Sequence, residues 1–178
     1  MRLTVPLLLF TLALAGCGSP SAKPVPTAIP LASYTDSQYG FSFRYPSNWT
    51  VPNKGGKIID VAGVSTYELD LNIPQNPAQV SVTVDGDVVP FPAFADGKTA
   101  PDPNGPTHTF QYFHAHVAGW PSMVIRRFTG KQITEVDTVT NTRTRSYDVR
   151  MLTATPPFSA DITQGYNHVV NSLKVPFS

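Results

Sequence analysis

The stretch YGFSFRYPSNW, residues 39 to 49, carries the strongest structural pattern in the chain. Aromatic side chains occupy alternate positions in its first half, and successive side chains of a strand point to opposite faces, so the pattern predicts a strand with one aromatic face. That face comprises Tyr39, Phe41, Phe43 and Tyr45. Pro46, Ser47 and Asn48 then indicate a turn, and Trp49 is expected to follow it as an anchor in the core.

The C-terminal end of the chain carries the second clear pattern, which is helical. Pro156 and Pro157 end the preceding strand, and Ser159 or Asp161 can cap a helix that runs to about Leu173. Its apolar residues recur at helical spacing and predict a buried stripe of Ile162, Tyr166, Val169, Val170 and Leu173. Gly165 within this helix is expected to lower its stability slightly.

The residues between the two ends alternate between apolar and polar types and predict a series of strands. Two segments, 67–73 and 79–84, alternate most cleanly. Their inward-facing residues are expected to be Tyr67, Leu69, Leu71, Ile73, Val80, Val82 and Val84. Further strands are expected at 57–64, 109–117, 122–128, 133–139 and 143–155, whereas residues 90–108 contain five prolines and are predicted to form a long loop. We therefore predict an α+β fold, an antiparallel sheet of about seven to eight strands with a C-terminal helix packed on it.

The N-terminal residues have the features of an export signal. Arg2 precedes an apolar run too short to cross a bilayer as a helix, and Leu14-Ala15-Gly16-Cys17 resembles a bacterial lipobox. We therefore predict a lipoprotein signal peptide at residues 1–16 and acylation of Cys17. Residues 17–33 are expected to form a proline-rich tether and residues 34–178 the folded domain. The alternative is an ordinary signal peptide in which Cys17 has no role.

Composition excludes several classes of partner. Without residues 1–16 the chain has equal numbers of acidic and basic side chains, 12 of each, which argues against binding nucleic acid. Cys17 is the only cysteine, so no disulfide can form within the chain. Acidic residues dominate 60–102 and basic residues dominate 126–150, and we expect these segments to be neighbouring strands that neutralise each other rather than a bipolar binding surface.

The opening and closing segments together resemble one known family. Tyr39 to Trp49 looks like the hairpin that begins PsbP-like and Mog1-like domains, and Tyr166 to Lys174 looks like their closing helix, with Leu173 where phenylalanine is usual. The resemblance implies a Mog1/PsbP-like α/β/α sandwich, a central antiparallel sheet with helices on both faces. This chain departs from the family at residues 90–108, where the family often carries a helix.

Members of the family that the chain resembles have diverse functions. The family includes extrinsic subunits of photosystem II, a factor that binds a small nuclear-transport GTPase, and exported bacterial lipoproteins of unknown role. The chain has no motif specific to the first two groups, and its lipobox matches the third.

His114 and His116 are the best chemical pair in the sequence. Residues two apart on a strand share a face, so these two imidazoles are weak candidates for one metal ion, with His108 upstream and Asp85 or Asp87 as further ligands. Two ligands bind a metal weakly, and the competing interpretation is a pair of surface histidines. Asp85-Gly86-Asp87 itself is better explained as a turn.

The sequence therefore favours a non-enzymatic binding or accessory module with no cofactor. Acylated Cys17 is expected to hold it to membrane lipid, facing outside the cytoplasm, and its partner is expected to be a protein of the cell envelope. The expected contact surfaces are a sheet edge, the 90–108 loop, or a basic strip. The strip would contain Arg126, Arg127, Arg143, Arg145 and Arg150. The alternative is a metal-binding protein or metal-dependent enzyme centred on His108, His114 and His116.

Overall fold

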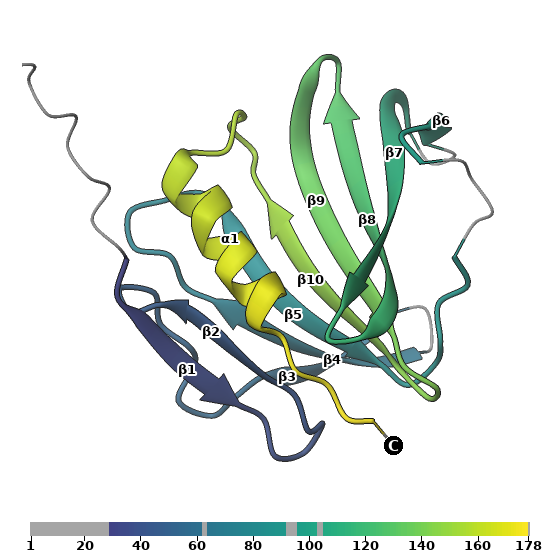
Figure 1. The fold of residues 1–178 in the computed structure, drawn as a ribbon. Helices are drawn as coiled ribbons and strands as arrows, with labels where there is room; N and C mark the ends of the chain where they lie inside the picture. Colours follow the sequence, from purple (N-terminus) through teal and green to yellow (C-terminus); the bar gives the residue numbers. More distant parts are fainter. Residues whose placement is uncertain (1–28, 62–63, 92–95, 103–104, 178) are drawn as a thin grey trace, which may run out of the picture.

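The fold consists of a large antiparallel sheet, a small hairpin and one helix (Figure 1). The computed structural model describes residues 29–61, 64–91, 96–102 and 105–177. β1 (Leu31–Thr35) pairs with β2 (Ser42–Pro46), and eight further strands form one sheet in the order β3-β4-β5-β10-β9-β8-β7-β6. These strands are β3 (Lys57–Val61), β4 (Val64–Leu71), β5 (Gln79–Asp85), β6 (Thr99–Asp102), β7 (Gly105–Val117), β8 (Trp120–Thr129), β9 (Gln132–Asn141) and β10 (Ser146–Leu152). The helix is α1 (Ala160–Ser172).

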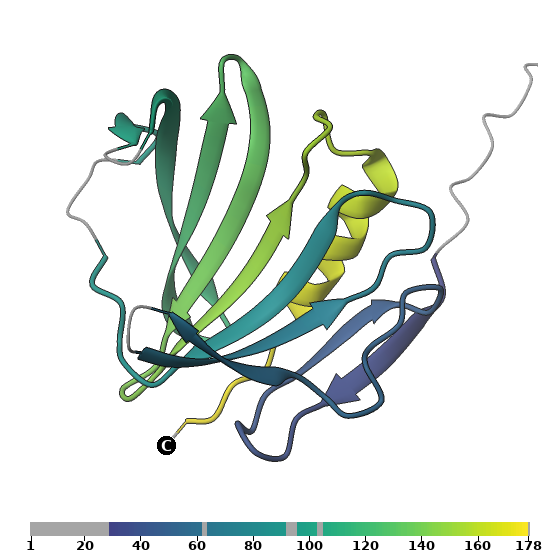
Figure 2. The same cartoon turned by 180° about the vertical axis from the view of Figure 1, so that it is seen from behind.

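The helix and the β1–β2 hairpin lie on the same face of the sheet, which we call the covered face (Figure 1). The core is built there from three sources: Phe41, Phe43 and Trp49 of the hairpin region, the alternate residues of β4, β5 and β10, and the buried stripe of α1. The opposite, open face carries no helix among the described residues (Figure 2). The α+β prediction is thus confirmed, and the second helical layer that the family resemblance implies is not found in the described part of the chain.

The alternating segments behave as their patterns predict. Each of the seven inward-facing residues expected in β4, in β5 and at Ile73, two residues beyond β4, is no more than 8% exposed. The β7–β8 connection is a two-residue turn of Ala118 and Gly119, with φ of 54° and 82°. Two positive φ values suit a tight hairpin between twisted strands, so Trp120 already belongs to β8 rather than to the turn.

Two segments differ from the sequence expectation. β1 begins at Leu31, so the last three residues of the predicted tether pair with β2. The prediction of a continuous loop at 90–108 is wrong in its second half, where Thr99–Asp102 forms β6 and Gly105 begins β7. Pro101 is compatible with β6 because this strand is at the edge of the sheet, where a missing N–H need not interrupt a ladder.

A hydrogen-bond network around Asp36 connects the β1–β2 hairpin to β4 of the sheet. Tyr67 of β4 donates to Asp36 at 2.5 Å, and Tyr34 of β1 donates to the same carboxylate oxygen at 3.1 Å. The backbone N–H of Gly56 in turn donates to the Tyr67 hydroxyl at 2.8 Å. This network satisfies a buried carboxylate and fixes the position of the hairpin above the sheet.

The C-terminal helix forms where its pattern predicts. Ser159 is the N-cap, and its hydroxyl accepts from the backbone N–H of Ile162 at 3.4 Å. Gly165, which the sequence suggests is a weakness, faces the indole of Trp49 so closely that a Cβ atom there would overlap the ring. The helix can therefore approach the hairpin closely because residue 165 has no side chain.

No helix in the described residues is long and apolar enough to span a bilayer.

Candidate functional site

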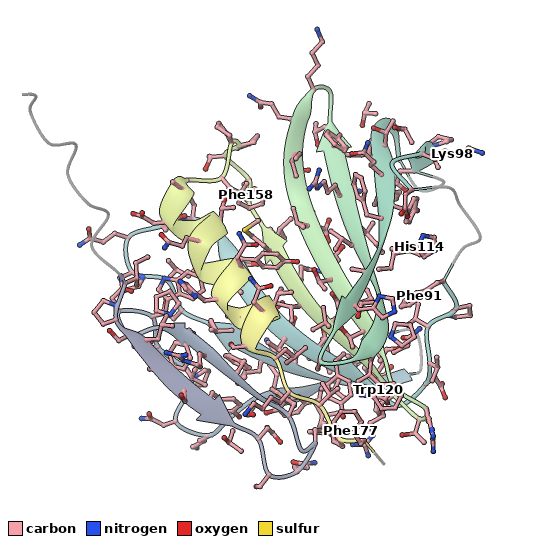
Figure 3. All side chains as sticks on the ribbon, viewed as in Figure 1. Phe91, Lys98, His114, Trp120, Phe158 and Phe177 are labelled. Atoms are coloured by element: carbon pink, nitrogen blue, oxygen red, sulfur yellow. The ribbon has the colours of Figure 1, made fainter. Side chains whose placement is uncertain are left out.

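A cleft of about 550 Å³ lies on the covered face between α1 and strands β7–β9. The helix packs on β10 and β2, and it leaves the adjoining part of the sheet uncovered (Figure 1). Eight of the fifteen lining residues are apolar: Ala115, Val117, Val124, Ile133, Val136, Met151, Phe158 and Val170. Phe158, one of these lining residues, lies just before the helix (Figure 3). A site of this size and lining falls within the range of small-molecule pockets.

A buried hydroxyl pair fixes the helix beside the cleft. Tyr166 of α1 donates to the carbonyl of Val149 at 3.2 Å, and its oxygen lies 2.6 Å from the hydroxyl oxygen of Thr138 on β9. Burial raises the pKa of Tyr166 above its ordinary value, so this hydroxyl stays neutral at physiological pH. These two hydrogen bonds therefore fix α1 as one wall of the cleft, and they engage the Tyr166 hydroxyl within the protein.

Arg126 is the cation of the cleft. Its side chain is half-buried, and the guanidinium carbon lies 4.7 Å from the centre of the Phe113 ring. It forms no salt bridge within the described residues, whereas Arg127 and Arg150 each bind carboxylates. Exposed polar side chains of α1, Thr163, Asn167 and Asn171, also line the cleft. The cleft thus combines apolar walls with one positive charge.

The structure does not assemble the predicted histidine site. His114 has its Nδ1 atom 2.6 Å from Asp96, while His108 has its Nδ1 atom 3.3 Å from the hydroxyl of Thr107 (Figure 3 shows His114). His116 instead lines the cleft. Within the described residues, no group of three or more histidine, cysteine, aspartate or glutamate side chains is placed to hold a metal ion. Asp85, the other proposed ligand, accepts a hydrogen bond from Thr66 at 2.7 Å.

The predicted basic strip is likewise divided between different surfaces. Arg126 and Arg127 are consecutive on β8 and point to opposite faces, Arg143 is exposed, and Arg145 lies over the Tyr39 ring. On the open face, Arg127 binds Asp102 at 3.0 Å and Glu135 at 3.3 Å. Arg150 binds Glu135 at 3.2 Å and Asp137 at 2.9 Å.

This open-face network corrects the expected charge pairing. Arg127–Asp102 joins the basic segment to the acidic one as predicted, but most of the pairing lies within the basic segment itself. Sequence reasoning missed the network, although Glu135 and Asp137 on β9, and Asp148 and Arg150 on β10, show charges at alternate positions. Burial raises the pKa of Asp148 to about 8, and nearby Asp137 adds to the shift. Burial also raises the pKa of Asp137 to about 6.

We expect these two carboxyl groups to make the protein less stable as the pH rises. Because their pKa values are higher in the folded state, the folded protein binds more protons than the unfolded chain between about pH 4 and pH 8. Their stabilising contribution is therefore present at acidic pH and is lost as the pH rises through the folded-state values. The slope for one such group reaches about 1.4 kcal/mol per pH unit.

Urea unfolding of wild type and Asp148→Asn at pH 5, 6.5 and 8 measures this dependence. We expect the substitution to flatten the decline in the free energy of unfolding and to make the variant at least as stable as wild type at pH 8. Asp87→Asn is the matched control, because Asp87 is exposed in a turn, and it should keep the wild-type slope. A free energy of unfolding that rises from pH 5 to pH 8 in wild type would show that the carboxyl groups are not protonated in the folded state.

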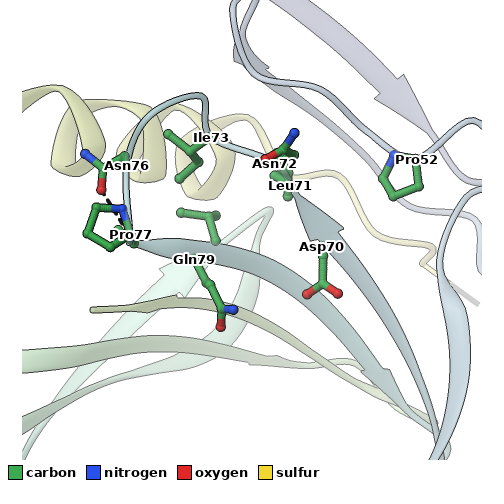
Figure 4. A pocket seen from close by; sticks show the side chains of 10 residues that line it. Pro52, Asp70, Leu71, Asn72, Ile73, Asn76, Pro77 and Gln79 are labelled. Atoms are coloured by element: carbon green, nitrogen blue, oxygen red, sulfur yellow. Dashed lines mark hydrogen bonds between the residues drawn. The ribbon is translucent and has the colours of Figure 1, made fainter. Parts of the chain in front are cut away.

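A second pocket, of about 370 Å³, lies at the β4–β5 connection (Figure 4). Its polar groups have partners within the protein: Asn76 accepts from the backbone N–H of Ala78 at 2.9 Å, and Asn72 exchanges two backbone hydrogen bonds with Thr50, which precedes β3. The lining contains one charged side chain, Asp70, which is exposed and binds Lys57. This pocket is therefore explained by the loop geometry, and the cleft beside α1 is the stronger candidate.

Comparisons with known proteins show a similarity to a solved structure. No family model matches the chain, and no curated protein matches it. Among solved structures, the chain is similar to the solution structure of cyanobacterial PsbP (CyanoP) from Synechocystis sp. PCC 6803, with 15% sequence identity and a TM-score of 0.47 over 90% of this chain and 99% of that one. The name of that structure includes PsbP, the family that the terminal motifs resemble.

Proposed function

We propose that this protein is a membrane-anchored lipoprotein that faces outside the cytoplasm, in the periplasm or at the cell surface, and acts as a non-enzymatic binding module for a protein of the cell envelope. The observation that carries the proposal is the cleft between α1 and β7–β9, with its apolar walls and the half-buried Arg126. Such a lining provides affinity through apolar contact and orientation through one charge. The partner is expected to insert a side chain or short segment there.

The N-terminal residues support the same proposal from another direction. Cys17 and the rest of residues 1–28 lie outside the described residues, and the lipobox remains a prediction from the sequence. If Cys17 is acylated, the 13 residues from Gly18 to Pro30 separate the lipid from β1. At about 3.1 Å per residue in a polyproline conformation, they reach about 40 Å. A binding domain on such a tether can meet partners that protrude from the membrane.

Filling the cleft is expected to prevent partner binding. Val170 lines the cleft from α1, and Val170→Trp would place an indole in it; Gln164→Trp puts the same side chain on an exposed helix position. Each full-length lipoprotein would be cross-linked in intact cells and recovered from solubilised envelope. We expect a protein partner with wild type and Gln164→Trp, and at least tenfold less of it with Val170→Trp at equal melting temperature. Equal recovery with all three would exclude the cleft as the binding site.

A further inference from the structure

We propose that the cleft beside α1 binds an anionic amphiphile, an aliphatic chain that ends in a carboxylate or phosphate, with the anion on Arg126 and the chain against the walls. This inference rests on the proposed use of the cleft for binding, and it assigns the chemistry of a ligand. It is independent of which envelope protein the module meets.

Arg126 differs from the other arginines of the sheet in what it contacts. The guanidinium groups of Arg127 and Arg150 are held by carboxylates of the open face at 2.9–3.3 Å. Arg126 points to the covered face, and its neighbour there is the Phe113 ring. Stacking on a ring restrains the guanidinium plane and leaves its N–H groups available for a carboxylate or phosphate. The charge is therefore positioned for an anion from outside the chain.

The rest of the lining determines what the anion must be attached to. Among the described residues, the lining of the cleft contains no acidic side chain that would oppose the charge of a bound anion. Its floor consists of Val124, Val136 and Met151, and Val170 and Phe158 form the facing wall. Transfer of one methylene from water to such an environment improves binding about fourfold. An aliphatic chain several carbons long fits a space of about 550 Å³ better than a compact anion such as acetate.

The shared chemistry has two possible sources near a membrane, a free fatty acid and an anionic lysophospholipid. Both have an acyl chain and a negative headgroup, and the lysophospholipid carries its charge on a phosphate. Decanoate and lysophosphatidylglycerol, each used below its micellar concentration, represent the two sources. 1-Decanol is the neutral probe of the same length as decanoate, and butyrate is the short anion.

Isothermal titration calorimetry tests the proposal with a chain that begins at residue 17 and carries Cys17→Ser, so that the protein's own acyl groups do not compete. We expect decanoate to bind at least fiftyfold more tightly than butyrate and at least tenfold more tightly than 1-decanol. Arg126→Gln should weaken decanoate binding at least tenfold and leave 1-decanol binding unchanged. Arg143→Gln, which removes an exposed arginine, should change neither. Tighter binding of lysophosphatidylglycerol, with the same loss in Arg126→Gln, would support the proposal and identify a phospholipid as the source.

Two results would overturn the proposal: no heat of binding from 1 mM decanoate or lysophosphatidylglycerol with wild type, or equal affinities in wild type and Arg126→Gln. The cross-linking experiment above distinguishes this failure from failure of the proposed function. If Val170→Trp abolishes partner capture and no amphiphile binds to wild type, the proposed binding-module function stands and the proposed ligand is excluded. If amphiphile binding depends on Arg126 and all cross-linking variants capture the partner equally, the ligand site is supported. The protein partner then binds elsewhere on the domain and not in the cleft.

Discussion

Replacing Cys17 with serine is expected to abolish acylation of the protein completely and to leave residues 1–16 attached. The lipobox places the cut directly before a cysteine whose thiol receives the acyl chains, and serine has no thiol. Acyl chains anchor a protein because each buried methylene contributes about 0.8 kcal/mol, and two or more chains are needed for stable attachment. Metabolic labelling with palmitate measures the acylation, and the mass of the mature chain shows whether the leader is removed.

The anchoring role of Cys17 is tested by separating acylation from export. When residues 1–16 are replaced by a signal peptide with a small-residue cleavage site, the Cys17→Ser chain should be exported and recovered in the soluble fraction. Ser19→Ala, in a chain that keeps its native leader, is the matched control, and it should stay acylated and sediment with membranes. A Cys17→Ser chain that remains membrane-bound after removal of its leader would show that a different part of the protein attaches it.

The two ends of the domain were predictable from the sequence because each follows from contacts between residues close in the chain. Alternation of aromatic residues around Phe41 and Phe43, and the capped stripe after Ser159, need only the geometry of a strand or a helix. The inward residues of β4 and β5 follow in the same way. β1 lacks this kind of signal, since LASYT has no clear alternation and its partner β2 defines it.

The candidate site was not predictable, because it depends on where distant segments meet. Arg126 and Arg127 are adjacent and chemically identical, but the pleat places one in the cleft and the other among Asp102 and Glu135. Sequence alone indicated a common strip. The cleft itself exists because α1 packs on β10 and β2 rather than across β8 and β9. That choice depends on the register of the helix against Trp49, a contact between residues more than a hundred positions apart.

Gly165 is where that register is fixed, and a larger residue there is expected to destabilise the whole domain. Helix propensity alone predicts that Gly165→Ala raises the free energy of unfolding by about 1 kcal/mol. The added Cβ would overlap the indole of Trp49, which is only 4% exposed, and would lie 3.0 Å from Pro46. Overpacking of a filled core typically costs about 1–3 kcal/mol, and both neighbours of the added methyl group are buried. We therefore expect Gly165→Ala to lower the free energy of unfolding by up to about 2 kcal/mol.

Leucine at the same position should be far more disruptive. A loss of about 4 kcal/mol or more approaches the total stability of an ordinary domain, so Gly165→Leu is expected to be largely unfolded at 25 °C. Gln164→Leu, one residue earlier on the exposed side of α1, adds the same side chain away from Trp49 and should change the free energy of unfolding by less than about 0.5 kcal/mol. Urea unfolding followed by circular dichroism gives each value.

A double-mutant cycle with Trp49 identifies the cause of the effect. Trp49→Leu leaves space beside residue 165, and it is itself expected to cost about 3 kcal/mol because it opens a cavity in the core. In that background the overlap is gone and only the helix propensity remains, so Gly165→Ala should become neutral or stabilising by up to about 1 kcal/mol. The same loss from Gly165→Ala in both backgrounds would contradict the steric explanation. A change of sign in the effect of Gly165→Ala on the free energy of unfolding would show that Gly165 is present because the helix must pass directly over the Trp49 ring. The same contact determines how much of β8 and β9 the helix leaves uncovered.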